Sequence, residues 1–336
     1  MSHLRLLTVD ELPALSEDPV AFLNQLNGPV VITVPGASSA GCRAVVTLLH
    51  GNEPSGMKAM LRYLRSGQKP AVTLHLFIIS VHTALHPPVF THRQIPGERD
   101  MNRTFRPPFD DDLGELASQI LAHLVHLAPE VVVDVHNTSG DGPAFAVSPA
   151  LSEAHIALTR LFTHRLVVTD LQLGSLMEIS STDCPAITIE CGGATGSVAD
   201  EVAYAGLCRL AAAENLFSWQ DMSSLDLYHH PVRLELAAEC SIVYDTALDA
   251  DVDLCLPPDI DHFNFGVVDP GVCLGRVRSA SCLRIKSAAG YQAIDEYFHV
   301  LPDGSLHPRV PLKLFMVTTN AAIARSDCLL YAVRQG

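Results

Sequence analysis

Apolar and polar positions alternate in blocks along the first two thirds of the chain, and the blocks have the lengths of strands and helices. Short apolar runs bounded by turn residues are typical of buried strands. They predict strands at Val30–Val34, Val45–Leu49, Val72–Ser80, Val131–His136, Ala144–Val147, Leu166–Thr169 and Ala186–Glu190. Longer stretches predict helices at Pro54–Arg65, Leu113–Leu127, Ser152–Thr163 and Ser197–Phe217. Strands that alternate with helices favour an α/β layered fold in this part of the chain.

The pattern changes after Trp219, where helical periodicity fades. Short β-like runs separated by turn residues take its place. They lie at Val232–Leu236, Ser241–Tyr244, Gly271–Val277, Tyr297–Val300 and Leu312–Val317. We therefore expect an α/β domain over residues 1–222 and a smaller, β-rich C-terminal domain over residues 223–336. A long irregular segment, Val81–Asp112, interrupts the first domain, and loops of such length are usually functional or disordered.

Composition narrows the class of protein. The chain has 336 residues, of which 48% are hydrophobic, so full hydrophobic cores are expected. The net charge of −15 without any basic cluster argues against a nucleic-acid partner. No apolar run reaches the roughly 18 residues of a membrane span, and the N-terminus lacks the basic start and apolar core of a secretion signal. Nine cysteines without a Cys-x-x-Cys pair indicate reduced thiols, so we expect a cytoplasmic protein without a membrane partner.

Polar residues with metal-binding chemistry stand where predicted strands end. His50 and Glu53 follow one strand, and His136 closes another. Ligands bind at the carboxyl ends of strands in open α/β sheets. Two histidines and one carboxylate with an open fourth position form the pattern of a catalytic zinc site. Taken singly, each residue also fits a bland interpretation, namely a loop histidine, a solvated glutamate and a strand-end histidine bonded to backbone.

Two carboxylates complete this predicted site. Asp134 lies two residues before His136 and shares its strand face, so its carboxylate can orient the imidazole. Glu190 closes the strand Ala186–Glu190 and is the candidate general base, which takes a proton from water and passes it to a leaving amine. Strand alternation turns the adjacent Cys191 to the other face, where it is expected to pack in a core.

A fourth stretch, Arg99–Phe105, ends the long irregular segment. Its adjacent Asn102 and Arg103 can hold a substrate carboxylate through a forked, charge-assisted set of hydrogen bonds. The alternative is a surface charge cluster.

The four stretches, in this order, resemble the succinylglutamate desuccinylase/aspartoacylase family, a branch of the zinc carboxypeptidase-like hydrolases. In that family a His-Gly-Asn-Glu motif and a later Asp-x-His-Asn supply the zinc ligands, which match His50, Glu53 and His136. The resemblance extends over about residues 30–217. It implies a mixed β-sheet flanked by helices, with a C-terminal β domain that helps to close the site.

The resemblance also implies roles for other residues. The catalytic glutamate of the family, in a Glu-x-Gly, matches Glu190. Its Asp-(Leu/Met)-Asn-Arg motif binds a substrate carboxylate and matches Asn102 and Arg103. An arginine shortly before that motif polarises the scissile carbonyl; Arg93 is the expected counterpart here and Arg99 the alternative.

Two details concern the substrate. A tyrosine from the C-terminal domain of the family reaches the substrate, and the segment Ala288–Tyr291 is similar to the one that carries it, which makes Tyr291 a candidate. Aspartoacylase-like sequences have an arginine about ten residues before the catalytic glutamate. The corresponding segment Ile179–Asp183 contains none, which argues against N-acetylaspartate as the substrate.

The expected function is therefore that of a zinc-dependent amidohydrolase, with one Zn²⁺ per chain, that deacylates an N-acyl amino acid or a similar small linear amide. A carboxypeptidase-like metallopeptidase and a metal-binding protein without catalysis are the alternatives. The sequence leaves open the acyl group, the amino acid, the metal used in the cell and the oligomeric state, a homo-oligomer included.

Overall fold

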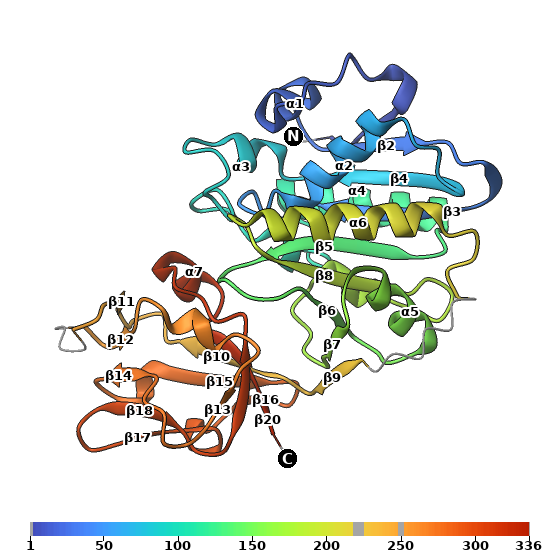
Figure 1. The fold of residues 1–336 in the computed structure, drawn as a ribbon. Coiled ribbons are helices and arrows are strands. Elements are labelled where there is room, and N and C mark those ends of the chain that lie inside the picture. Colours follow the sequence, from blue (N-terminus) through green and yellow to red (C-terminus); the bar gives the residue numbers. More distant parts are fainter. Residues whose placement is uncertain (1–2, 218–224, 248–251, 336) are drawn as a thin grey trace. The chain divides into compact units, whose positions relative to one another are not determined.

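The computed structural model describes residues 3–217, 225–247 and 252–335, which form two compact units (Figure 1). The first unit comprises Met1–Asn137, Ala144–Leu166 and Gln172–Leu227. The second comprises Thr138–Pro143, Val167–Leu171 and Tyr228–Gly336. The domain boundary predicted between residues 222 and 223 lies outside the described residues.

A nine-stranded mixed sheet contains the strands of the first unit, in the order β1-β2-β4-β3-β5-β8-β6-β7-β9. The strands are β1 (Arg5–Thr8), β2 (Val30–Val34), β3 (Ser38–Thr47), β4 (Val72–Ile78), β5 (Val132–Thr138), β6 (Phe145–Ser148), β7 (Arg165–Val168), β8 (Ala186–Gly193) and β9 (Asp226–His229). β3 is parallel to both β4 and β5, and β8 follows β5 in the sheet. β3, which precedes His50, is therefore a neighbour of β5, which carries His136, and β5 is a neighbour of β8, which carries Glu190.

Helices cover both faces of this sheet (Figure 1). They are α1 (Pro19–Leu26), α2 (Ser55–Ser66), α3 (Val81–Leu85), α4 (Asp112–Leu127), α5 (Glu153–Phe162) and α6 (Ser197–Ala212). Strand alternation sends Ala44 and Val46 of β3 into one buried cluster with Ile120 of α4. The opposite face receives α2, where a Cβ added at Gly56 would lie 2.1 Å from Thr47 Oγ1. Only glycine allows α2 to approach β3 so closely.

Several elements differ from the prediction: β5 and β8 extend beyond His136 and Glu190, and β14 (Gly275–Val277) begins only at Gly275. Two further differences follow from contacts with distant segments. β3 begins at Ser38, before the predicted Val45, because its exposed residues pair with β4 through an irregularity between Ser38 and Cys42. α6 ends at Ala212, short of Phe217. Nη1 of the buried Arg43, on β3, donates to the oxygens of Leu210 at 2.5 Å and Ala213 at 2.7 Å. This side chain satisfies the last carbonyls, so the helix stops there.

The second unit is β-rich and has its own apolar core. It contains a six-stranded sheet, β13-β19-β20-β10-β15-β16, and a five-stranded sheet, β11-β12-β14-β18-β17. Its elements are β10 (Val232–Leu236), β11 (Ile242–Tyr244), β12 (Leu254–Leu256), β13 (Val267–Val268), β14 (Gly275–Val277), β15 (Leu283–Ser287), β16 (Gly290–Gln292), β17 (Phe298–Val300), β18 (Ser305–Pro308), β19 (Leu312–Phe315), α7 (Ala321–Ser326) and β20 (Leu330–Arg334).

The predicted fold class, a mixed sheet flanked by helices with a smaller β-rich C-terminal part, is confirmed. Among the described residues, no helix combines the length and the apolar character that crossing a membrane requires.

Candidate metal centre

The turn after β3 is tightly constrained. Leu48 has a φ of +58°, a left-handed conformation that is uncommon for a residue other than glycine. Ser80 Oγ donates to the oxygen of Leu49 at 2.9 Å. A Cβ added at Gly51 would lie 2.7 Å from the backbone nitrogen of Ala84, so the turn is packed directly against α3. These constraints fix where the next residue, His50, emerges from the sheet edge.

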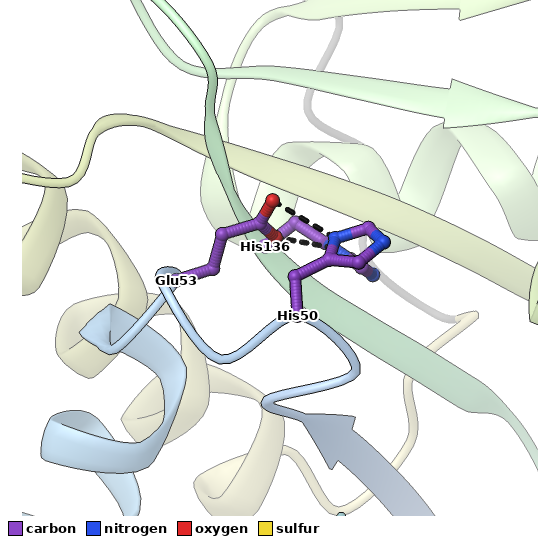
Figure 2. A group of neighbouring side chains, drawn as sticks. All are labelled: His50, Glu53 and His136. Atoms are coloured by element: carbon purple, nitrogen blue, oxygen red, sulfur yellow. Dashed lines mark hydrogen bonds and ion pairs between the residues drawn. The ribbon is translucent and has the colours of Figure 1, made fainter. Parts of the chain in front are cut away.

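Three buried side chains converge beyond this turn (Figure 2). The carboxylate of Glu53 lies between two imidazoles. Its Oε1 is 2.9 Å from His50 Nδ1, and its Oε2 is 2.6 Å from His136 Nδ1. One potential ligand atom from each residue lies within 4.8 Å of the others. The structure therefore brings together the three residues that the sequence predicted as metal ligands.

The remaining nitrogen of each imidazole is held by another carboxylate. His136 Nε2 is 2.7 Å from Asp134 Oδ2, and His50 Nε2 is 2.9 Å from Asp100 Oδ1. Such carboxylates behind imidazoles are typical of metal ligands, because they fix the ring orientation and the tautomer. With both Nε2 atoms engaged, both Nδ1 atoms point to the shared centre. Two imidazole nitrogens and a carboxylate oxygen form a donor set that fits Zn²⁺.

The carboxylates and imidazoles of this cluster stabilise one another in their charged forms, against the effect of burial. Burial disfavours the protonated form of His136, but Asp134 and Glu53 outweigh it and raise the pKa of the imidazole well above its ordinary value. Burial and Arg93 likewise oppose protonation of His50, and the neighbouring carboxylates still raise its pKa. Burial alone would raise the pKa of Glu53, but the two imidazoles lower it. The centre therefore favours positive charge beside Glu53, which a divalent cation supplies in place of protons.

Glu190 lies on β8 opposite Phe145 of β6 and is only 6% exposed. Burial raises the pKa of its carboxyl to about 8; the charge of Glu53 adds to this, while His136 opposes it. Its Oε2 atom is buried and has no hydrogen-bond partner among the residues that the structure describes. A buried carboxyl with a raised pKa and an uncommitted oxygen is suited to proton transfer. The adjacent Cys191 is buried, as expected, and burial raises the pKa of its thiol well above the ordinary value.

The two arginine candidates lie in different places. Arg93 Nη2 and Nε are 2.8 and 3.0 Å from Asp100 Oδ2, and Arg93 Nη1 is 3.5 Å from Glu53 Oε1. Arg99 instead pairs with Asp111, which caps the start of α4; Arg99 Nε is 2.6 Å from Asp111 Oδ2. Arg93 therefore lies at the candidate metal centre, and Arg99 is engaged at a helix terminus.

Asn102 and Arg103 belong to a short 3-10 turn, η2 (Met101–Arg103). Asn102 is buried, and its Nδ2 is 3.4 Å from His136 Nε2. Its Oδ1 accepts a hydrogen bond from the backbone of Leu176 at 2.9 Å, so the protein itself uses the amide oxygen. Arg103 is half-buried and donates to the oxygen of Asn102 at 2.9 Å.

Tyr291 lies in the second unit, on β16, and is 63% exposed. Its hydroxyl donates to Glu235 Oε2 at 3.2 Å, within the same unit. Its role toward a substrate stays a prediction.

Asp100 is a site residue to which the sequence assigned no role. It is the acidic residue of the Asp-Met-Asn-Arg motif, but its partner His50 is 50 positions away along the chain. The only local signal is its place in the same motif, two residues before Asn102. The contact itself depends on the path of the irregular segment between α3 and α4.

Known structures share this fold, although sequence comparison finds no relative. A scan against family models gives no match, and a comparison with curated proteins gives none. The fold is that of solved deacylase structures. One is a succinylglutamate desuccinylase/aspartoacylase from Rhodobacter sphaeroides, with 14% identity, a TM-score of 0.60, and 91% of this chain and 89% of that chain covered.

Two other similar structures extend the comparison. The succinylglutamate desuccinylase from Chromobacterium violaceum has 12% identity and a TM-score of 0.59, with 96% of this chain and 98% of that chain covered. Murine aminoacylase 3 has 15% identity and a TM-score of 0.58, with 89% and 96% covered. The similarity extends over nearly the whole chain, so the fold expected from the sequence motifs is confirmed.

Proposed function

We propose that this protein is a zinc-dependent deacylase of the succinylglutamate desuccinylase/aspartoacylase type, which hydrolyses the amide of an N-acyl amino acid or a similar small linear amide. One observation carries the proposal. Two imidazoles, each backed by a carboxylate, converge with Glu53 where the turn after β3 meets β5, and the neighbouring strand β8 carries the buried Glu190. The fold, shared with desuccinylases and an aminoacylase, supports the same class of reaction.

The metal ligands would be His50, Glu53 and His136. Bound zinc supplies Lewis acidity, which polarises a carbonyl and makes water a nucleophile near neutral pH. Glu190 accepts the proton of the attacking water on its uncommitted oxygen and then delivers it to the leaving amine. Burial raises the pKa of this carboxyl in the metal-free protein, and the positive charge of a bound metal would oppose that rise, so the carboxylate can accept the proton and then give it up.

Arginine side chains supply the positive charge for the substrate. Arg93 is anchored by Asp100, and its Nη1 faces Glu53 at 3.5 Å. This position suits a donor to the carbonyl oxygen as negative charge develops there. Arg103 supplies charge for a substrate carboxylate, and Asn102 contributes its Nδ2 donor and positions the turn. Tyr291, which belongs to the second unit, is proposed as a further residue that binds the substrate.

Amine release from a panel of N-acyl amino acids tests the proposal. The panel contains N-succinylglutamate, N-acetylaspartate, and neutral and basic N-acetyl amino acids, offered to zinc-loaded protein and to its Glu190→Gln variant. We expect turnover of at least one member and a loss of about 10²- to 10⁴-fold in the variant, with zinc still bound. Silence across the panel, with zinc shown to be bound, would refute the deacylase proposal and favour a peptide substrate or a protein without catalysis.

A further inference from the structure

A chain of hydrogen bonds leads from the candidate metal centre to the first turn of α6. It runs through Asn137, Ser55 and Asp200, all in the first unit. Asn137 follows the ligand His136, Ser55 lies two residues after the ligand Glu53, and both are buried. The chain ends at the half-buried Asp200, which pairs with Lys58.

The donors and acceptors fix the direction of this chain. Ser55 Oγ donates to Asp200 Oδ1 at 2.6 Å, a short bond to a charged acceptor. Since the hydroxyl has one proton, Ser55 Oγ must be the acceptor from Asn137 Nδ2, at 2.9 Å. The second Nδ2 proton of Asn137 goes to the oxygen of Gly192 at 2.9 Å, and its Oδ1 accepts from the backbone of Ser55 at 3.1 Å. Every polar group of this amide is thus used.

The amide of Asn137 joins three parts of the site. It connects the end of β5, which carries His136, to the start of α2, just after Glu53. It also connects both to Gly192, two residues after Glu190 on β8. Because Glu190 Oε2 has no hydrogen-bond partner in the described part of the chain, the position of that carboxylate relative to the ligands depends on how the end of β8 is held. Pairing with β6 holds the strand at Glu190, and the Asn137 bond to Gly192 adds a constraint just beyond it, on the side of the metal ligands.

We propose that Asp200 is a positioning residue for the metal centre: through Ser55 it orients Asn137, which sets Glu190 against the metal ligands. This inference rests on the proposed function. Asp200 accepts the only proton of Ser55, so the hydroxyl keeps its acceptor side toward Asn137. Lys58 Nζ, 3.0 Å from Asp200 Oδ2, balances the charge. The competing explanation is that Asp200 merely stabilises the N-terminus of α6, where acidic residues are favourable.

Four variants of the full chain separate these explanations. Asp200→Asn removes the charge. Ser55→Ala breaks the chain but leaves Asp200 in the first turn of α6. The double variant tests whether the two act together. Glu201→Gln is the matched control, because Glu201 is the next residue on α6 and forms a surface ion pair with Arg62 at 2.6 Å.

Two quantities are measured for each variant: Zn²⁺ affinity by competition with a fluorescent chelator, and kcat and KM with a substrate found in the panel. We expect Asp200→Asn and Ser55→Ala each to weaken Zn²⁺ binding or kcat by about 10-fold, as partners behind metal ligands do, with KM nearly unchanged. The double variant should lose little more than either single variant, because both change the same link between Ser55 Oγ and Asp200. Glu201→Gln should match the wild type.

The opposite result is equally clear. If Ser55→Ala and Asp200→Asn leave both Zn²⁺ affinity and kcat within twofold of the control, the positioning role is wrong, whatever their effect on thermal stability. An Asp200→Asn variant that fails to fold leaves Ser55→Ala to decide. A protein inactive toward the whole panel would refute the proposed function, while the Zn²⁺ affinities would still test the chain of hydrogen bonds.

Discussion

Glu190→Gln should make the metal-free protein more stable than the wild type at alkaline pH. Glutamine keeps the shape of the side chain but carries no charge at any pH. The wild-type carboxyl is buried beside Glu53, and its pKa rises to about 8 from an ordinary value of 4.5. Below pH 4.5 the carboxyl is neutral in the folded and the unfolded chain, so the two proteins should differ little in stability.

The difference between them grows as the pH rises. Between pH 4.5 and about 8 the unfolded chain releases a proton that the folded protein keeps, so the wild type loses stability relative to the variant. Above about pH 8 the folded protein is ionised too, and the difference becomes constant. The pKa differs between an ordinary value of 4.5 and about 8 in the folded protein. At about 1.4 kcal/mol per pKa unit, the variant can exceed the wild type in free energy of unfolding by at most about 5 kcal/mol. We expect a gain of at least about 1 kcal/mol, because water entering the site will reduce the full value.

Urea unfolding of chelator-treated protein at a series of pH values from 4 to 9 measures this effect. The exposed Glu98 offers a matched control, Glu98→Gln, in the same unit. The free energy of unfolding of Glu190→Gln should rise steadily with pH relative to that of the wild type, whereas that of Glu98→Gln should not. A difference between Glu190→Gln and wild type that stays constant across the range, or that favours the wild type at pH 9, would show that burial does not raise this pKa and would remove the electrostatic argument for Glu190.

Other predictions concern the metal, the arginines and the packing of the turn. Removing Zn²⁺ with a chelator should lower the melting temperature, and the loss should be smaller or absent in His136→Ala, as a thermal melt will show. Asp134→Asn should weaken Zn²⁺ binding about 10- to 100-fold in a chelator competition, and unchanged affinity would mean that the carboxylate does not support the ligand. Arg93→Met should lower kcat about 10²- to 10³-fold, whereas Arg99→Met should leave it near the wild-type value; equal losses would contradict the placement at the metal centre. Gly56→Ala should destabilise the protein by about 1 to 3 kcal/mol in urea unfolding, since its Cβ would lie 2.1 Å from Thr47 Oγ1.

The sequence by itself determined the strands that end at the site and the residues placed there. Buried strands are short apolar runs, so their positions can be read locally to within a few residues, and His50 with Glu53 forms a local motif. His136 and Glu190 each close such a run as well. That these ends meet depends only on the strands lying in one sheet, which the alternation of strands and helices predicts.

Tertiary structure decided what depends on contacts between distant segments. The sequence left open whether Arg93 or Arg99 lies at the site, and only the path of the irregular segment places Arg93 on Asp100 and Arg99 on Asp111. The end of α6 is likewise set by Arg43, far away on β3.

The carboxylates that support the site show the same division between local and distant contacts. Asp134 could be predicted, because it shares a strand face with His136 two residues away. Asp100 and Asp200 could not, because each reaches its partner across a separation of 50 and 145 residues, respectively. A strand or a helix turn repeats over a few residues and leaves a pattern in the sequence. A hydrogen bond between segments that meet only in the folded chain leaves no such pattern.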